Sequence, residues 1–412
     1  MKSLKHFHDK KSQTSLNMNI LFLCRLPILQ NQGGIERVSF LLASEFSRKG
    51  HNVYAIYTTH AEKTADLTSF PFRQIEFNSD DKRTPKLISG FIKSRNIDIV
   101  INQCIEKPHL KILKKFDRGA AKVITVLHNK PFPTHGIELK AKTLTYPSNI
   151  RGKILKRMTL KYPGIYRLVR TAFDKSIYTE AVRFSDRLML LSERFIDPLM
   201  ELAPNICRSK IDAINNPNTF HIPDSVNDKK ENLVIWVGRL IDPQKNTKDF
   251  IDSWNIFQKD HPDWNSIIIG DGPHRRIFEE YANKTMARNL TFAGNQKNIS
   301  EYYSKAKILC MTSLYEGWPM VLSEAMAYNV VPVVFNTFLS LNDIIDNHSN
   351  GMLIPPFDTC RMADALSCLA NDSNLLSSMG DNARHSILKY NLDAISNQWI
   401  IKMRQLSSSC MS

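Results

Sequence analysis

The sequence predicts an α/β fold of two facing domains, each built on a parallel sheet, with a ligand-binding cleft between them. A chain of 412 residues is too long for one ordinary core and suits two domains. Short apolar runs alternate with helical patterns along the chain, which is typical of parallel sheets covered by helices on both faces. Residues 213–232, rich in Asn, Pro and charge, divide this alternation into two series. Because open parallel sheets bind ligands at the carboxyl ends of their strands, the site is expected in the cleft.

The N-terminal stretch is not predicted to be a signal peptide. The apolar run of residues 20–29 is interrupted by Arg25 and is not followed by a small-residue cleavage site, so we expect it to contain a first strand. Residues 1–17 are polar and are expected to form a disordered leader. No stretch of 18 apolar residues occurs, so no membrane-spanning helix is predicted.

The first series predicts an N-terminal domain of residues 18–215. A helix opens at Gly33 and Gly34 and runs to Arg48, with its apolar residues recurring on one face, and Gly50 ends it. The strands of this domain are predicted at Asn19–Cys24, Val53–Tyr57, Asp98–Asn102, Val123–His128, Leu188–Ser192 and Ile211–Asn215.

The second series follows a predicted linker, residues 216–232, and forms a C-terminal domain of residues 233–390. A last helix, residues 391–412, is expected to pack back on the N-terminal domain. The strands of the C-terminal domain are predicted at Leu233–Val237, Ser266–Ile269, Asn289–Phe292, Ile308–Met311 and Val331–Phe335.

Cysteine usage indicates a reducing compartment. The seven cysteines are scattered, without a C-x-x-C pair or a close histidine cluster. This distribution favours free thiols in a cytoplasm and disfavours a structural zinc site.

The positive charge is concentrated. Net charge is +15, and between Lys140 and Arg183 eleven basic residues are opposed only by Asp174 and Glu180. Such an excess of positive charge could bind nucleic acid, anionic lipid or a phosphorylated substrate. No RNA-binding signature is present and no basic stripe is interleaved with aromatics at motif spacing, which disfavours nucleic acid.

Apolar side chains are mixed with these basic ones. The mixture suits an amphipathic surface at an anionic bilayer. The alternative is a helix pair packed on the domain with a solvated basic face. The apolar residues concerned are Ile154, Leu155, Met158, Leu160, Ile165, Tyr166, Leu168, Val169 and Phe173.

The residues from 315 to 334 predict an anion site flanked by two carboxylates. Glu316 follows a strand, and Pro319 suits the first turn of the next helix. The N–H groups of Met320 and Val321 would then point at a diphosphate, and Glu324 lies about one turn further on. Two carboxylates beside an anion site suit the hydroxyls of a sugar and a ribose. The alternative is a helix-terminal charge and a solvated helix residue.

Three further strand ends carry candidate residues. Arg239 and Lys245 follow the strand that ends at Val237, where they could neutralise phosphate charge or be ordinary surface charges. The G-D-G-P segment of residues 270–273 permits either a close backbone approach or a simple turn. His128 ends another strand, where it could orient an acceptor or be a satisfied structural histidine.

Taken in order and spacing, these features resemble the large retaining family 4 of glycosyltransferases. The resemblance is carried by E-x7-E at Glu316 and Glu324, V-G-R-L and Lys245 at 237–245, G-D-G-P at 270–273 and G-G-I-E-R at 33–37. It covers roughly residues 19–400 and is strong over 233–357. It implies the GT-B fold of two facing Rossmann-like domains.

The resemblance also implies roles for the matching positions. Arg239 and Lys245 would hold the donor diphosphate and stabilise the leaving nucleotide, Glu316 would contact donor-sugar hydroxyls, and Glu324 would bind the ribose. With His128 at the acceptor side, the catalytic set is Glu316, His128, Arg239 and Lys245. Further donor contacts would come from Gly33, Gly34, Asp271, Gly272, Gly317, Trp318, Met320 and Val321.

Such enzymes usually need no metal, and no D-x-D occurs here to hold one. No cofactor is expected, since the nucleotide sugar is a substrate. The chain departs from the family at Asn329 and Thr219, where glycine is usual, and at residues 335–345, which replace a Gly-Pro loop. Asn tolerates a left-handed cap, so the turn at Asn329 can survive.

The resemblance therefore implies transfer from a UDP- or GDP-sugar to a glycan or a polyprenyl- or other lipid-linked acceptor, in lipopolysaccharide, O-antigen or capsule synthesis. The expected location is the cytoplasm, at the inner face of the cytoplasmic membrane. The alternatives are a nucleotide-sugar epimerase or phosphorylase of similar architecture and a non-catalytic sugar-nucleotide- or RNA-binding protein.

Overall fold

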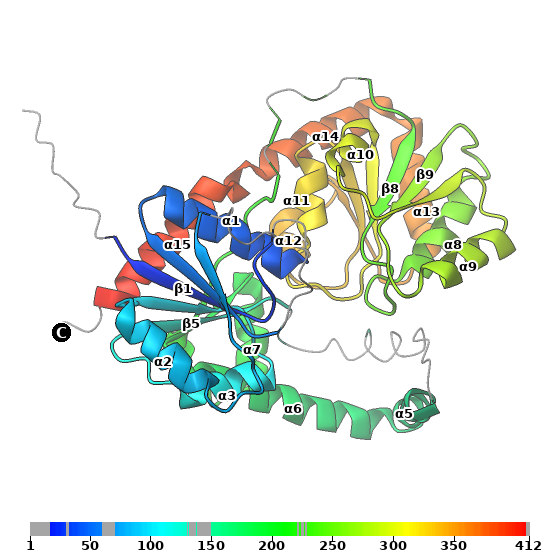
Figure 1. Ribbon diagram of the computed structural model, residues 1–412. Helices are drawn as coiled ribbons and strands as arrows, with labels where there is room; N and C mark the ends of the chain where they lie inside the picture. Colours follow the sequence, from blue (N-terminus) through cyan, green and yellow to red (C-terminus); the bar gives the residue numbers. More distant parts are fainter. Residues whose placement is uncertain are drawn as a thin grey trace, which may run out of the picture.

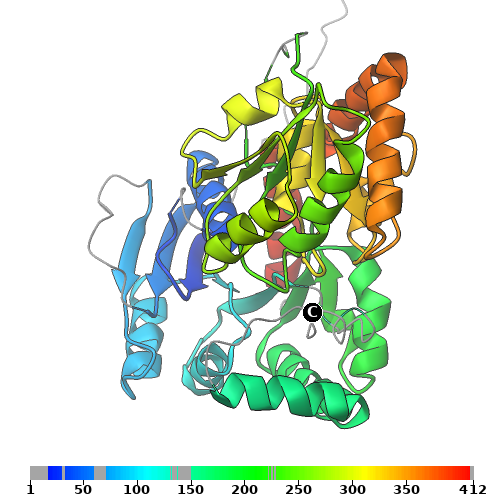
Figure 2. The same cartoon turned by 90° about the vertical axis from the view of Figure 1, so that its right-hand side faces the viewer.

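The computed structural model describes residues 17–29, 33–59, 71–129, 150–220 and 229–408, together with residues 131, 137, 222, 223 and 226. Two α/β domains stand side by side, as Figures 1 and 2 show. The predicted leader, except Asn17, and part of the predicted linker lie outside the described residues.

The N-terminal domain contains a parallel sheet in the order β3-β2-β1-β4-β5-β6-β7. The strand order reverses at β1, with β2 and β3 on one side of it and β4 to β7 on the other. At such a switch point the connections after neighbouring strands run in opposite directions, so the carboxyl ends of β1 and β4 frame an opening. The strands are β1 (Asn19–Cys24), β2 (Asn52–Tyr57), β3 (Arg73–Glu76), β4 (Ile99–Asn102), β5 (Lys122–Leu127), β6 (Arg187–Leu190) and β7 (Ile211–Ala213).

Helices cover this sheet because their apolar residues recur on one face. In α1, for example, Val38, Leu42 and Phe46 are buried. The helices are α1 (Gly34–Arg48), α2 (Thr84–Ser94), α3 (Lys107–Lys115), α5 (Ile150–Lys161), α6 (Pro163–Phe184) and α7 (Ile196–Leu202), with short 3-10 turns η1 (Glu193–Phe195) and η2 (Arg208–Lys210).

The C-terminal domain repeats the plan with a parallel sheet in the order β10-β9-β8-β11-β12-β13. Its strands are β8 (Leu233–Val237), β9 (Asn265–Ile269), β10 (Leu290–Gly294), β11 (Ile308–Met311), β12 (Val331–Phe335) and β13 (Met352–Ile354). Its helices are α8 (Thr247–Phe257), α9 (Arg275–Lys284), α10 (Ser300–Lys305), α11 (Met320–Met326), α12 (Leu341–Ile344), α13 (Thr359–Asn371), α14 (Ser373–Ser386) and the turn η3 (Leu388–Tyr390).

The predicted fold class of two parallel-sheet domains is confirmed, but the sequence did not predict β3 and β13. Both are edge strands of three or four residues. An edge strand packs against one neighbour only, so it needs no long apolar run, and the R-Q-I-E sequence of β3 has none.

One buried apolar cluster runs through both domains. It joins Phe22 and Phe46 of the N-terminal domain to Leu309 and Leu322 of the C-terminal domain. The helix α15 (Leu392–Ser408) belongs to the same cluster, because it crosses back from the C-terminal domain and packs on α1. Figure 1 shows α15 in red beside α1.

Polar contacts also cross between the domains. The Lys49 ammonium at the end of α1 lies 2.9 Å from the Asp393 carboxylate and donates to Ser396 of α15 at 2.8 Å. Arg194 of η1 forms an ion pair with Asp343 of α12 at 2.7 Å. These contacts hold the two sheets in one arrangement.

The helices α5 and α6 stand apart from this packing. Figure 1 shows α6 running along the lower edge of the N-terminal domain, with α5 at its far end. The second half of α6 packs on the domain through Tyr178, Ala181 and Val182, whereas α5 and the first half of α6 are largely exposed. Their exposed apolar side chains are Ile150, Ile154, Leu155, Met158, Leu160, Tyr162, Ile165, Leu168, Val169 and Phe173.

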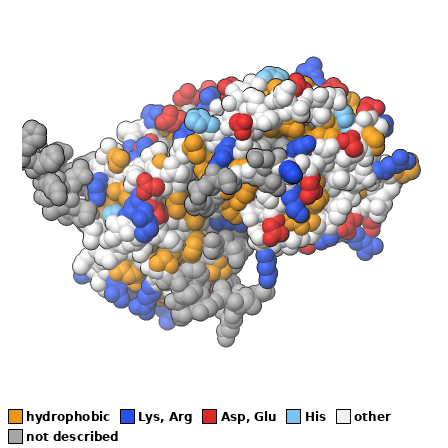
Figure 3. Space-filling model, turned by 90° about the horizontal axis from the view of Figure 1, so that it is seen from above, with side chains coloured by type: hydrophobic (Ala, Val, Ile, Leu, Met, Phe, Trp, Pro, Cys, Tyr) orange, Lys and Arg blue, Asp and Glu red, His pale blue; other side chains and the backbone are white. Residues whose placement is uncertain are grey.

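Charge elsewhere is mixed. Seen from above, acidic and basic side chains are interspersed over both domains (Figure 3). On α5 and α6, by contrast, basic residues far outnumber Asp174 and Glu180, and Asp174 is buried and paired with Arg170 at 2.9 Å. Lys140 and Lys142, the first two residues of the predicted basic segment, lie outside the described residues. Within the described part of the chain, no helix has the length and apolarity needed to span a bilayer.

Replacement of Trp399 on α15 tests the shared core. Its side chain is 3% exposed and lies in the cluster with Phe46. Trp399→Ala removes the indole from a closely packed site, so we expect the free energy of unfolding to fall by about 3–5 kcal/mol in urea titrations. Ile401→Ala is the control on the same helix, because Ile401 is 54% exposed, and it should change stability by less than about 0.5 kcal/mol. Equal effects of the two substitutions would show that α15 is not docked as described.

Candidate functional site

Two segments of the C-terminal domain that were predicted to carry site residues, those with Lys245 and Glu316, lie together. The loop after β8 and the loop after β11 are adjacent because their strands are neighbours in the sheet. The Leu314 N–H donates to the Gln244 carbonyl at 2.8 Å, and the Thr312 hydroxyl donates to the Lys245 carbonyl at 3.1 Å. These bonds fix the loop bearing Lys245 against the loop bearing Glu316.

Lys245 and Glu316 form an ion pair at the bottom of this region. The Lys245 Nζ donates to Glu316 Oε1 at 2.6 Å, and both side chains are mostly buried. The lysine stem passes over Gly238, where a Cβ would lie in ordinary van der Waals contact with Lys245 Cδ, 3.4 Å away. An ammonium has three donors, so Lys245 can hold Glu316 and still bind an anion.

Arg239 faces the N-terminal domain. It is exposed and lies in the wall of a cavity of about 490 Å³ whose other lining residues come from that domain. The cavity begins at the carboxyl ends of β1 and β4, where Arg25 and Glu106 form an ion pair at 2.9 Å. The N-terminal residues in its wall are Cys24, Arg25, Leu26, Ile28, Gly33, Ile35, Glu36, Ser39, Cys104 and Glu106.

The two domains approach each other through glycines. A Cβ on Gly317 would lie 1.9 Å from the His128 carbonyl oxygen, and a Cβ on Gly34 would lie 2.8 Å from Met320 Cε. Any side chain at Gly317 would therefore force the loop after β11 away from the end of β5. The predicted residues Gly34, His128, Gly317 and Met320 thus meet where the domains touch.

Glu324 is not the solvated helix residue of the alternative interpretation. Its side chain is 3% exposed. Oε1 accepts from Arg37 Nη1 at 3.0 Å and from the Thr219 hydroxyl, and Oε2 accepts from the Tyr303 hydroxyl at 3.1 Å. The carboxylate is therefore part of a buried polar cluster at the domain boundary.

His128 is half-buried at the domain boundary and is uncharged at neutral pH. Burial lowers the pKa of His128 to about 4. Its Nε2 lies 2.5 Å from Oε1 of Gln103, and because an amide oxygen only accepts, Nε2 carries the proton. Gln103 follows β4 as His128 follows β5, so the two side chains meet at neighbouring strand ends. Such a histidine suits hydrogen bonding better than proton transfer near pH 7.

Three other residues predicted to contact the donor, Asp271, Gly272 and Trp318, have partners within the C-terminal domain. A Cβ on Gly272 would lie 2.4 Å from the Leu240 carbonyl oxygen, so this glycine lets the loop after β9 pack closely on the loop after β8. Asp271 bonds within its own loop and to Arg275 at 3.3 Å. The Trp318 ring lies in the core against Tyr390, with centroids 5.0 Å apart. Burying a large indole is favourable, and the sugar contact expected of Trp318 stays a prediction.

Sequence reasoning missed several residues of this region. Arg25 was read only as an interruption of an apolar run, and Thr219 only as a departure from a family pattern. Arg37 lay within the G-G-I-E-R segment without an assigned role. Their partners, Glu106 and Glu324, are distant in the chain. A lone charge directly after a predicted strand was the available signal for Arg25.

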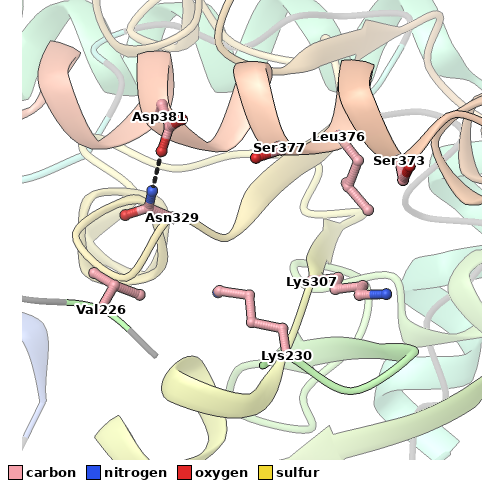
Figure 4. A pocket seen from close by; sticks show the side chains of 8 residues that line it. All are labelled: Val226, Lys230, Lys307, Asn329, Ser373, Leu376, Ser377 and Asp381. Atoms are coloured by element: carbon pink, nitrogen blue, oxygen red, sulfur yellow. Dashed lines mark hydrogen bonds between the residues drawn. The ribbon is translucent and has the colours of Figure 1, made fainter. Parts of the chain in front are cut away.

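A second cavity, of about 360 Å³, lies between α14 and the residues that precede β11 and β12 (Figure 4). Lys230 in its wall donates to the carbonyls of Ala306 at 2.7 Å and Tyr328 at 2.6 Å, and burial lowers the pKa of Lys230 to about 7. Asn329 has a φ of 55°, so the left-handed turn expected at this position is present, and its amide donates to Asp381 at 2.5 Å. No predicted site residue lines this cavity.

Comparison with known proteins agrees with this geometry. Residues 218–386 match the family model described as Glycosyl transferases group 1. This segment contains Arg239, Lys245, Glu316 and Glu324, so the four charged candidates lie within that domain.

Two curated relatives are similar to the chain. A Campylobacter jejuni enzyme, GalNAc-α-(1→4)-GalNAc-α-(1→3)-diNAcBac-PP-undecaprenol α-1,4-N-acetyl-D-galactosaminyltransferase, is 29% identical over 246 residues, which is 58% of this chain and 63% of that protein. An uncharacterized glycosyltransferase of Haemophilus influenzae is 26% identical over 374 residues, covering 89% of this chain and 95% of the relative.

A solved structure shares the fold. Anabaena HepE in complex with UDP superposes with a TM-score of 0.72 at 14% identity, covering 94% of this chain and all of that one. The GT-B arrangement expected from the sequence resemblance is therefore confirmed.

The lowered pKa of His128 predicts a pH dependence of stability. The unfolded chain binds a proton at this imidazole below about pH 6.5, whereas the folded chain does so only near pH 4. Stability from this group is present above pH 6.5 and is lost as pH falls toward 4. Between pH 7 and pH 4.5, the unfolding free energy of the wild type should therefore fall by about 2 kcal/mol more than that of His128→Gln. The measurement is urea titration at each pH.

The control for this measurement is His385→Gln, because His385 is exposed on α14. It should follow the wild-type pH profile. If His128→Gln does so too, His128 is not held neutral by burial.

Proposed function

We propose, from the glycosyl transferases group 1 domain that residues 218–386 carry, that the protein is a glycosyltransferase. It moves a sugar from a nucleotide-diphosphate donor to a glycan or lipid-linked acceptor in the synthesis of a bacterial surface polysaccharide. The observation that carries the proposal is the Lys245–Glu316 ion pair at the edge of an interdomain cleft that also holds Arg239.

The charges of the cleft match the needs of glycosyl transfer. As the bond between the sugar and the diphosphate breaks, negative charge grows on the leaving diphosphate. Lys245 and Arg239 supply positive charge there from fixed positions, which stabilises a transition state more than mobile water does. The second oxygen of Glu316 can accept from donor-sugar hydroxyls while the first remains bonded to Lys245.

Donor and stereochemistry follow the family resemblance. The donor is a UDP- or GDP-sugar, and UDP is the first candidate because the structurally similar Anabaena protein binds UDP. Transfer retains the anomeric configuration and needs no divalent metal, since Arg and Lys side chains provide the charge that a metal would otherwise supply.

The acceptor binds in the cavity of about 490 Å³ on the N-terminal side. Its wall contains the charged groups Arg25, Glu36 and Glu106, which can donate to and accept from sugar hydroxyls. Ser39, also in the wall, is fully buried, and no partner within the described residues bonds its hydroxyl. A neutral sugar hydroxyl would satisfy such a group.

A lipid-linked acceptor explains the helices α5 and α6. They carry exposed apolar side chains beside Lys153, Arg157, Lys161 and Arg167 and belong to the acceptor-side domain. Exposed apolar groups of this extent on a charged helix suit the boundary of an anionic bilayer. The Campylobacter relative, by its name, acts on an undecaprenol-linked glycan. The protein would then work at the inner face of the cytoplasmic membrane.

Loss of either partner of the ion pair should abolish most activity. Glu316→Gln and Lys245→Ala each remove a charge-assisted contact that strengthens in the transition state, so we expect turnover to fall about 30- to 1000-fold. The measurement is sugar transfer from UDP- and GDP-sugars, with NMR of the product linkage and a parallel reaction in EDTA.

The matched control is Lys248→Ala, which breaks a lysine–aspartate pair at 2.5 Å on α8 and lies outside the cleft. It should keep wild-type turnover. Near wild-type activity of both cleft variants would contradict the site assignment. An inverted linkage would contradict retention, and inhibition by EDTA that added metal reverses would contradict metal independence. Conversion of the donor without transfer would favour an epimerase.

Binding to vesicles tests the role of α5 and α6. Each basic side chain near an anionic surface contributes about 1 kcal/mol, so reversing four of them should weaken binding to anionic liposomes by roughly 1000-fold or more. The variant combines Lys153→Glu, Lys156→Glu, Arg157→Glu and Lys161→Glu, and the readout is co-sedimentation with and without anionic lipid.

Four reversals on the C-terminal domain, at Lys259, Lys284, Arg288 and Lys297, provide a control of equal charge. This control should still sediment with anionic liposomes. If the wild type does not bind liposomes, or if the α5 variant binds them as well as the wild type does, the proposed membrane role is wrong and the acceptor is bound from solution.

A further inference from the structure

Glu324 is bonded from three separate parts of the chain. Arg37 lies on α1 in the N-terminal domain, Thr219 lies in the segment between the domains, and Tyr303 lies on α10. Arg37 Nη1 and the Thr219 hydroxyl both donate to Oε1, whereas the Tyr303 hydroxyl donates to Oε2. The carboxylate is therefore held in one orientation by donors that converge only in the folded, two-domain arrangement.

Burial makes these bonds necessary. Glu324 is 3% exposed and Arg37 is 27% exposed, so the pair lies largely away from water. A buried carboxylate without a partner is costly, because it loses its hydration and gains nothing in return. The Arg37 guanidinium also lies over the Phe220 ring, 5.7 Å from its centroid, so its own position is restricted.

The Arg37–Glu324 bond depends on the closeness of the domains. Gly34, in the first turn of α1, lies against Met320, where α11 begins. Arg37 is one turn further along α1, and Glu324 is just over one turn further along α11. If the domains moved apart by the length of a hydrogen bond, the contact between the two side chains would break.

We propose that Arg37 is a positioning residue for the donor site: it orients Glu324 from the opposite domain, so that this carboxylate can accept a ribose hydroxyl of the nucleotide. The proposal rests on the proposed function. A carboxylate offers about four acceptor positions, and the three donors named above leave room for another on Oε2. Nucleotide affinity then depends on a residue of the N-terminal domain, although Arg239, Lys245 and Glu316 all belong to the C-terminal one.

Thr219 supports the same orientation. Where the family pattern has glycine, this chain supplies a hydroxyl that donates to the oxygen also held by Arg37. Two donors on one oxygen fix the plane of the carboxylate better than one does. The substitution from glycine therefore adds a contact to the donor site.

The test compares UDP with 2′-deoxy-UDP by calorimetry, with GDP and 2′-deoxy-GDP as the second pair. The wild type should prefer the ribonucleotide. Loss of a hydrogen bond to a charged group weakens binding about 10- to 100-fold, so Arg37→Ala should weaken binding of the ribonucleotide by this factor and that of the deoxynucleotide much less. Arg37→Lys should restore part of the preference, and Thr219→Val should reduce it.

Arg194→Ala is the matched control, because it breaks another arginine pair between the domains, with Asp343 at 2.7 Å, and does not touch Glu324. It should leave the preference for the ribonucleotide unchanged. Should Arg37→Ala fail to fold, Thr219→Val and Arg37→Lys carry the test.

Two results overturn the inference alone: the variants at Arg37 and Thr219 bind both nucleotides as the wild type does, or Arg194→Ala alters the preference as much as Arg37→Ala. Absence of any UDP or GDP binding by the wild type would contradict the proposed function, and the inference with it.

Discussion

The first turns of α1 and α11 meet across the domain boundary, and the chemistry of the cleft depends on this contact. Close to it, Gly317 must lack a side chain, since a Cβ there would lie 1.9 Å from the His128 carbonyl oxygen, whereas Gly34 lies against the flexible end of the Met320 side chain. Once the backbones are this close, Glu324 is enclosed and must find donors in both domains. A cleft that is closed on one side in this way keeps water from the charges that face a ligand, which strengthens their interactions with it.

The shared core explains how two separate sheets maintain such a contact. A buried apolar cluster continues from the N-terminal sheet through α15 to α11, so the domains are not joined by a linker alone. Arg194 and Lys49 add ion pairs at the edges of the interface. Apolar burial provides most of the attraction and is non-directional, whereas the ion pairs and glycine contacts favour one relative orientation.

The helices α5 and α6 differ from the rest of the molecule in the composition of their exposed surface. Elsewhere exposed large apolar side chains are scattered and charges of both signs are mixed, but these helices expose many apolar residues, such as Leu155 and Leu168, beside an excess of positive charge. Folding alone gives no reason for this arrangement, because exposed apolar area costs stability in water. A partner that is both apolar and anionic accounts for it, and this is why the acceptor is proposed at a membrane.

Local patterns in the sequence were sufficient for the fold class, for most strands and for the segments that carry Lys245 and Glu316, because hydrophobic periodicity and strand-end residues are properties of neighbouring positions. The edge strands β3 and β13 were missed because runs of only three or four residues leave no periodic signal. The partners of Glu324 could not be deduced, since Arg37 is 287 residues away and Thr219 105 residues away. The core position of the Trp318 ring and the neutral state of His128 likewise depend on burial by distant segments. The sequence by itself determined which chemical groups stand at the strand ends, whereas only the tertiary structure decided which of them meet, because burial and pairing arise where segments far apart in the chain come into contact.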